Sequence, residues 1–129
     1  MNLKIFNPHL ISALRPKQWT KNFLVFSAPL FSYSNNQLIW FSALVTFISF
    51  CFISSSIYLI NDVLDIEADR NHPKKNKRAI ASGLVSKKDA ILFSIFLLLL
   101  GFLFALILDK NVVIVFTAYF LIQFSYCLY

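Results

Sequence analysis

The stretch LIWFSALVTFISFCFISSSIYLI, residues 38–60, decides the fold class of this chain. It has no charged residue over 23 positions, and a bilayer core about 30 Å thick needs roughly 20 helical residues to cross it. The stretch therefore predicts a transmembrane helix. Two further charge-free runs, at 90–108 and 112–129, predict two more.

The composition agrees with a membrane protein. Of the 129 residues, 58% are hydrophobic and 14% are charged, and the mean hydropathy is +0.68. A soluble domain is about 25% charged, and a disordered chain is poor in apolar residues. The two cysteines, Cys51 and Cys127, lie inside apolar runs. A soluble fold, disorder and a disulfide scaffold are therefore excluded.

A fourth span is expected at about residues 16–33, although its apolar part is short and contains Pro29. If this segment crosses, Arg15, Lys17 and Lys21 at its start and the basic residues between 70 and 88 lie on one side, which the positive-inside rule makes cytoplasmic. The expected fold is an all-α, polytopic bundle of four transmembrane helices, with the N-terminus and the loop 61–89 in the cytoplasm. The net charge of +6 comes from residues beside apolar runs, which favours a membrane surface and anionic lipid-linked ligands over nucleic acid.

An acidic cluster, NDVLDIEADR at residues 61–70, follows the central span and holds four of the six acidic residues. On a helix, Asn61, Asp62, Asp65 and Asp69 fall within roughly a 100° arc. Like charges four residues apart repel, so the stripe favours a bound cation. Hard oxygen donors suit Mg²⁺ or Mn²⁺, and nearby basic residues suit phosphate oxygens. The pattern fits the departure of a diphosphate. The alternative is a solvated helix end that pairs with nearby Lys and Arg.

These residues resemble those of a known family. The pattern Asn61-Asp62-x-x-Asp65-x-x-x-Asp69 is similar to the first aspartate-rich motif of the UbiA superfamily of intramembrane prenyltransferases, and the loop 70–83 resembles the segment that follows it. The opening RPKQWTKN, residues 15–22, resembles one branch, the decaprenyl-phosphate phosphoribosyltransferases. The resemblance implies a bundle of about nine helices, in which Mg²⁺ holds a diphosphate substrate between two aspartate-rich motifs.

The resemblance also implies roles for individual residues. Asp62, Asp65 and Asp69 would be catalytic and, with Asn61 in support, would hold the metal. The basic residues Lys17, Lys21, Lys75 and Arg78 would contact the substrate's phosphates, although the positive-inside rule explains basic residues here equally well. Trp19 is expected at the membrane interface and His72 in a structural role.

The implied reaction transfers phosphoribose from phosphoribosyl diphosphate to a polyprenyl phosphate, for cell-wall precursors made at the plasma (inner) membrane. Two alternatives stay open. One is an aromatic prenyltransferase that joins a polyprenyl diphosphate to an acceptor such as 4-hydroxybenzoate. The other is a non-catalytic membrane subunit.

This sequence departs from the family pattern in two places. Ala79 stands where proline is usual, and the second aspartate-rich motif does not occur before Tyr129. We therefore expect the chain to be the N-terminal part of a longer membrane protein and to be inactive alone.

Overall fold

The computed structural model describes residues 7–33 and 35–129, in which every regular element is a helix. The all-α prediction is confirmed. In chain order the elements are α1 (Pro8–Ala13), the 3₁₀ helix η1 (Pro16–Phe26), α2 (Ser27–Phe31), α3 (Gln37–Leu64), α4 (Ile66–Asn71), the 3₁₀ turn η2 (Lys75–Lys77), α5 (Lys87–Leu108) and α6 (Lys110–Leu128).

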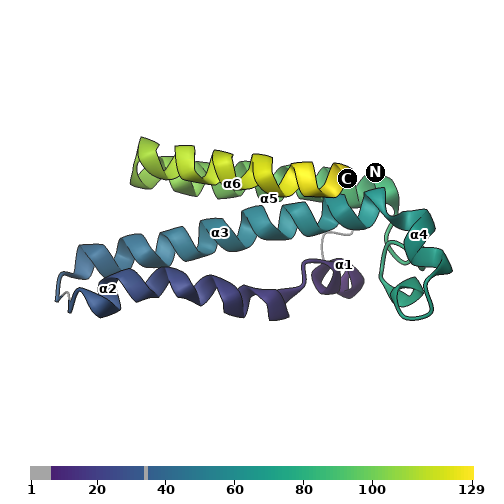
Figure 1. The fold of residues 1–129 in the computed structure, drawn as a ribbon, viewed down its shortest axis with the longest axis horizontal. Coiled ribbons are helices and arrows are strands. Elements are labelled where there is room, and N and C mark those ends of the chain that lie inside the picture. Colours follow the sequence, from purple (N-terminus) through teal and green to yellow (C-terminus); the bar gives the residue numbers. More distant parts are fainter. Residues whose placement is uncertain (1–6, 34) are drawn as a thin grey trace.

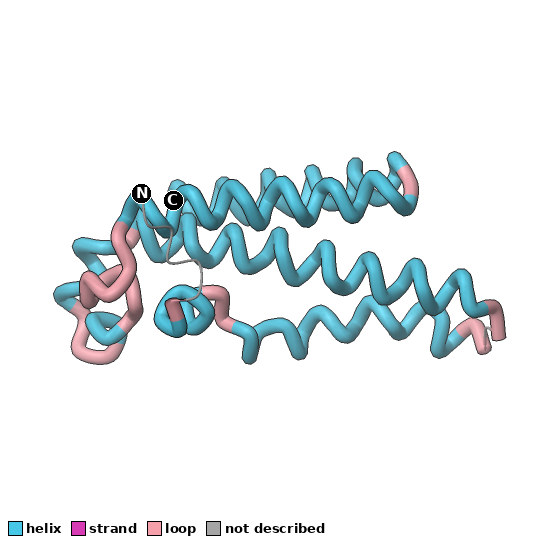
Figure 2. The backbone as a smooth tube through the Cα atoms, turned by 180° about the vertical axis from the view of Figure 1, so that it is seen from behind, coloured by secondary structure: helices cyan, strands magenta, loops and turns pink. Residues whose placement is uncertain are grey.

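The long helix α3 forms the centre of the molecule (Figure 1). Segment η1–α2 runs along one side of α3, and the antiparallel pair α5 and α6 lies on the other (Figures 1 and 2). Helices α3 and α5 approach closely at Gly101, where an added Cβ would lie 2.6 Å from Cγ1 of Ile53 and 3.1 Å from the carbonyl oxygen of Ser49. The absence of a side chain at Gly101 therefore permits this packing.

Polar side chains begin the three long helices. Asn36, Ser86 and Asp109 are the N-cap residues of α3, α5 and α6, and each accepts a hydrogen bond from a backbone N–H in the first turn. Such caps satisfy donors that have no partner within the helix. Asp109 is extended, with φ −167°, and this single residue reverses the chain between α5 and α6.

Three helices are long and apolar enough to cross a membrane, among the residues described: α3, α5 and α6. They contain the apolar runs that begin at residues 38, 90 and 112. In α6 only Phe116 is buried, so most of that helix presents apolar side chains outward.

The segment 16–33 differs from the single α-helix that we expected. Its first eleven residues form η1, and five more form α2. A 3₁₀ helix rises about 2.0 Å per residue and an α-helix about 1.5 Å, so the two together extend about 30 Å, which is close to the thickness of a bilayer core. Whether this segment crosses the membrane stays a prediction.

Two apolar clusters form the core. One contains Ile53, Ile57, Ala105 and Phe116 and joins α3, α5 and α6. The other lies where α3 ends, and its buried members come from α1, α3, α5 and the loop 78–86. Leu10, Leu59, Ile80 and Val85 are each at most 5% exposed in this second cluster. It holds α1 and the loop against the end of α3, where the polar residues gather.

Candidate functional site: an ion-pair cluster at the end of α3

The acidic motif does not form one continuous helix. Helix α3 ends at Leu64, Asp65 has φ −91° and ψ 11°, and α4 starts at Ile66. The expected single stripe of carboxylates is therefore corrected: Asp62 lies on the last turn of α3, and Asp69 lies on the short helix that follows. Both are buried, at 3% and 2% exposure.

Two arginines neutralise these two buried carboxylates. Nη2 of Arg15 donates to Oδ1 of Asp62 at 2.5 Å. Nη1 of Arg78 lies 3.1 Å from the same oxygen and 2.7 Å from Oδ2 of Asp69. Burial of a charge is costly unless the charge is paired and hydrogen-bonded. We call these four residues the ion-pair cluster.

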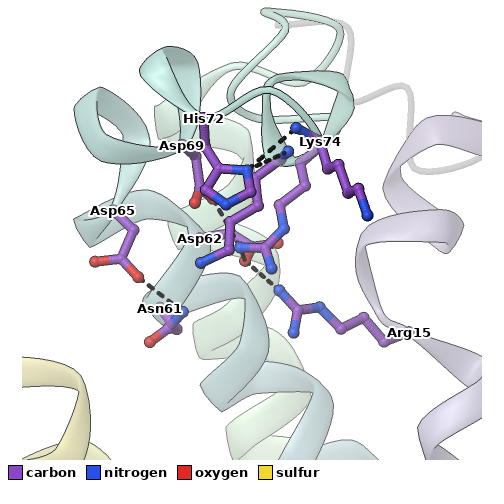
Figure 3. Close-up of polar contacts among 9 residues, drawn as sticks. Arg15, Asn61, Asp62, Asp65, Asp69, His72 and Lys74 are labelled. Carbon is purple, nitrogen blue, oxygen red and sulfur yellow. Dashed lines mark hydrogen bonds and ion pairs between the residues drawn. The ribbon is translucent and has the colours of Figure 1, made fainter.

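Asp65 and Asn61 form a separate pair beside the ion-pair cluster. The side-chain amide of Asn61 donates to Oδ2 of Asp65 at 3.1 Å, and Asp65 points away from Asp62 (Figure 3). The structure thus brings Asp62 and Asp69 together, whereas it places Asp65 apart with Asn61.

The loop that carries Arg78 is fixed by its own hydrogen bonds. Nδ1 of His72 accepts from the backbone N–H groups of Lys74 and Lys75 (Figure 3). Nε of Arg70 donates to the carbonyl oxygen of Ala81 at 3.1 Å. His72 therefore organises the turn through the backbone, as its predicted structural role requires.

The predicted phosphate-binding residues occupy two different environments. Arg78 belongs to the ion-pair cluster, with 27% of its side chain exposed. Lys17 and Lys21 are exposed on η1, and Lys75 is exposed in the loop. All four ion pairs among the described residues use arginine as the cation, so these lysines remain available to a ligand.

Sequence reasoning assigned no site role to Arg15. The feature of the sequence that could have indicated a role for Arg15 is its place at the start of the RPKQWTKN motif. In the structure Arg15 has a left-handed backbone, with φ 53°, and its guanidinium lies 4.8 Å from the centre of the Tyr58 ring. A non-glycine residue in this conformation is uncommon and indicates a local constraint.

The donor set suits a hard cation in part. Oxygens of Asp62 and Asp69 converge on one point, the Nη1 atom of Arg78. Carboxylates of this kind hold Mg²⁺ when water and substrate phosphates complete its shell. No group of three or more His, Cys, Asp or Glu residues with the arrangement of a metal site occurs within 7–33 and 35–129. Two carboxylates, with Asn61 and Asp65 beside them, are therefore the available ligands.

The apolar helices and the charged cluster at one end of α3 are those of a helical membrane protein with a polar site at one end of its bundle. The chain belongs to the UbiA prenyltransferase family, whose model matches residues 22–129. The predicted family is thereby confirmed.

Individual relatives are similar over most of the chain. The decaprenyl-phosphate phosphoribosyltransferase of Mycolicibacterium smegmatis is 40% identical over 123 residues, which cover 92% of this chain and 39% of the relative. The Corynebacterium glutamicum protein of the same name is 39% identical, over 92% of this chain and 37% of the relative. Nodulation protein NoeC of Azorhizobium caulinodans is 35% identical, over 69% of this chain and 29% of the relative. The chain spans about two fifths of the length of the first two.

Proposed function

We propose that the protein containing this chain is a membrane transferase that moves phosphoribose from phosphoribosyl diphosphate to a polyprenyl phosphate such as decaprenyl phosphate. The observation that carries this proposal is the 40% identity, over 92% of the chain, to a decaprenyl-phosphate phosphoribosyltransferase. In this reaction the bond between the ribose C1 and the diphosphate oxygen breaks. The diphosphate leaves with the bonding electrons, and an oxygen of the polyprenyl phosphate bonds to C1.

The ion-pair cluster would form part of the diphosphate site. Asp62 and Asp69 would hold a divalent cation, for which Mg²⁺ is the best fit, with Asp65 and Asn61 in support. A bound Mg²⁺ neutralises negative charge as it develops on a departing diphosphate. Arg78 would bind phosphate oxygens through its several N–H donors.

The exposed lysines would guide anionic substrates to this site. Lys17 and Lys21 lie on η1, whose first residues are close to the cluster, and Lys75 lies in the loop that also carries Arg78. An ammonium group attracts phosphate as a point charge without fixed geometry. This end of the bundle would face the cytoplasm. Of the eleven described Lys and Arg residues, ten lie within 15–21 or 70–88, in the cluster or in the segments next to it, and Lys110 begins α6 at the other end.

The test uses the full-length protein in vesicles, with radiolabelled phosphoribosyl diphosphate, decaprenyl phosphate and MgCl₂. Labelled lipid is the expected product, and chelation of the metal with EDTA should abolish it. If the labelled phosphoribosyl diphosphate is converted neither to labelled lipid nor to a water-soluble reaction product, the proposal is contradicted and a non-catalytic subunit is favoured. In a parallel assay with a polyprenyl diphosphate and 4-hydroxybenzoate, transfer of the polyprenyl chain to the ring with release of diphosphate would identify the aromatic prenyltransferase alternative.

A pair of matched substitutions tests the role of the cluster. Asp62→Ala should reduce turnover at least about a hundredfold, since it removes a charge-stabilising group, while the protein still inserts into membranes. Asp89→Ala makes the same change at an exposed position at the start of α5 and should leave turnover within about twofold. Equal turnover in the two variants would contradict the assignment of Asp62.

A further inference from the structure

Polar side chains of η1 and of the residue before it contact α3, and three of these contacts lie along one face of α3. Each uses a residue of the RPKQWTKN motif, and the pairs run antiparallel. They are Asn22 Nδ2 to Cys51 Sγ at 3.3 Å, Trp19 Nε1 to Ser55 Oγ at 2.9 Å, and Arg15 Nη2 to Asp62 Oδ1 at 2.5 Å. We call this set the polar ladder.

The 3₁₀ conformation of η1 matches the spacing of the polar ladder. From Cys51 to Asp62, α3 rises about 16 Å. The seven steps from Arg15 to Asn22 would rise about 10 Å in an α-helix and about 14 Å in a 3₁₀ helix. The long Arg15 side chain covers the remaining distance. The register of the ladder therefore depends on the backbone conformation where η1 begins.

Ser55 contacts the chain on both sides of the turn where η1 begins. Its side chain is buried, with the residue 1% exposed. Its hydroxyl accepts the Trp19 indole N–H and donates to the carbonyl oxygen of Leu14 at 3.1 Å. This carbonyl belongs to the peptide bond that enters Arg15, where the backbone turns into the left-handed region. One hydroxyl thus fixes the chain on both sides of the turn.

We propose that Ser55 is a positioning residue, which acts through Arg15 on Asp62. By holding the Leu14 carbonyl and the Trp19 indole, Ser55 sets the turn from which Arg15 crosses the Tyr58 ring and binds Asp62. Arg15 in turn holds the Asp62 carboxylate toward Arg78 and Asp69. This inference rests on the proposed function, because the oriented carboxylate matters for binding a divalent cation with a diphosphate.

The first experiment measures the affinity of the purified full-length protein for inorganic pyrophosphate in MgCl₂, by calorimetry in detergent. Ser55→Ala should weaken binding about tenfold, as expected for the loss of a buried hydroxyl that forms two hydrogen bonds. Ser55→Thr keeps the hydroxyl and should restore most of the affinity. The matched control is Ser49→Ala on the same helix. Ser49 is also buried but donates only to its own helix, at the Val45 carbonyl, so affinity should change less than twofold.

A double-mutant cycle tests whether Ser55 acts through Arg15. In an Arg15→Gln background, Ser55→Ala should have little further effect on affinity, because the residue it positions is gone. A full tenfold loss in that background would overturn the proposal, as would equal affinities for Ser55→Ala and Ser49→Ala. If Ser55→Ala fails to fold, Trp19→Phe removes one of the two contacts and should cause a smaller loss in the same direction, which Arg15→Gln should again suppress.

The thermal unfolding midpoints of Ser55→Ala, Arg15→Gln and the double variant, measured without ligand, form a second cycle. This cycle separates the inference from the proposed function. If the wild-type protein binds no pyrophosphate, the proposed function is wrong. Non-additive midpoints for Ser55→Ala and Arg15→Gln would then still support the positioning of Arg15, and additive midpoints would overturn it.

Discussion

At the scale of single residues, arginine and lysine have different roles in this chain. The arginines of the ion-pair cluster reach buried carboxylates, while the lysines at the same end are exposed. A guanidinium is planar and carries five N–H donors, so one group can bridge two carboxylates, as Arg78 does. An ammonium is more strongly hydrated and is better placed in water. The choice between two cations of equal charge thus follows from burial.

This difference predicts the effect of substitutions at Arg78. Arg78→Gln leaves Asp69 buried without its cation and should destabilise the protein by about 2 kcal/mol. This value lies below the usual range for a broken buried pair because Arg78 is partly exposed and Arg15 still neutralises Asp62. Arg78→Lys should restore only part of the loss. Thermal unfolding of the full-length protein in detergent measures both.

The control for Arg78 is Lys77→Gln, which removes the same charge from the adjacent, exposed position. Its effect should stay within about 0.5 kcal/mol. Equal destabilisation by Lys77→Gln and Arg78→Gln would show that stability depends on the net charge of the loop and not on the contacts of Arg78 with the two carboxylates.

The sequence indicated part of this cluster. Asp62, Asp69 and Arg78 stand out because the acidic motif and the basic loop are adjacent in the chain. Arg15 lies 47 positions before Asp62, and no local spacing reveals that the two meet. The interruption of the helix at Asp65 was also hidden, since the residues around it, such as Leu64 and Ile66, are compatible with a continuous helix.

At the scale of elements, close packing of α3 against α5 depends on a small residue. Helices in lipid gain no hydrophobic driving force from one another, so van der Waals contact at small residues becomes important. The position of Gly101 against Ile53 and the Ser49 carbonyl provides that contact. The charge-free runs predicted these helices, but they carried no information on which faces meet.

Gly101→Val should therefore separate α3 from α5. The added side chain would overlap Ile53 and should destabilise the protein by about 2 kcal/mol, as overpacking does. Combining it with Ile53→Ala should recover part of this loss, because the second substitution removes the atoms that clash. The thermal unfolding midpoint in detergent is again the measurement.

Ala118→Val provides the comparison for Gly101→Val, since it enlarges a small residue at an exposed position of α6. It should change stability by less than about 0.5 kcal/mol. If Gly101→Val is equally mild, or if Ile53→Ala only adds to its effect, the two helices do not depend on this contact.

Segment η1 shows why element type could not be fully predicted. Its residues are equally compatible with an α-helix, and long 3₁₀ helices are uncommon. The polar ladder to α3 favours the longer rise of this conformation, and that ladder exists only after the two segments pack. Tertiary contacts therefore decide the local structure here.

At the scale of the whole molecule, charge separates the two ends of the bundle. Helix α1, the ion-pair cluster and the loop before α5 lie at one end, and the end of α2, the start of α3 and the turn at Asp109 lie at the other (Figures 1 and 2). The contact of Arg15 with Asp62 fixes the start of η1 at the charged end. Segment 16–33 then has enough length to reach the far end, where α3 begins.

Cysteine accessibility in cells tests this topology. In a full-length protein with its other cysteines replaced, His9→Cys and Asn76→Cys report on the charged end, and Asn35→Cys and Asn111→Cys report on the opposite end. All four positions are outside the long apolar runs. The positive-inside rule predicts that a membrane-impermeant thiol reagent labels only the second pair in intact cells, and that both pairs react after the cells are opened.

Each pair serves as the control for the other, because opened cells show which cysteines are chemically reactive. Labelling of His9→Cys and Asn76→Cys in intact cells would reverse the proposed orientation and place the ion-pair cluster outside. Protection of Asn35→Cys beside labelling of Asn111→Cys would show that residues 16–33 do not cross. The bundle would then have to place α3 asymmetrically in the bilayer, since η1 and α2 run beside most of its length (Figure 1). Such a position would bury polar residues at the junction of α2 and α3, such as Ser32 and Asn35, in lipid. Burial of polar groups in lipid is costly, and on that ground we expect the segment to span.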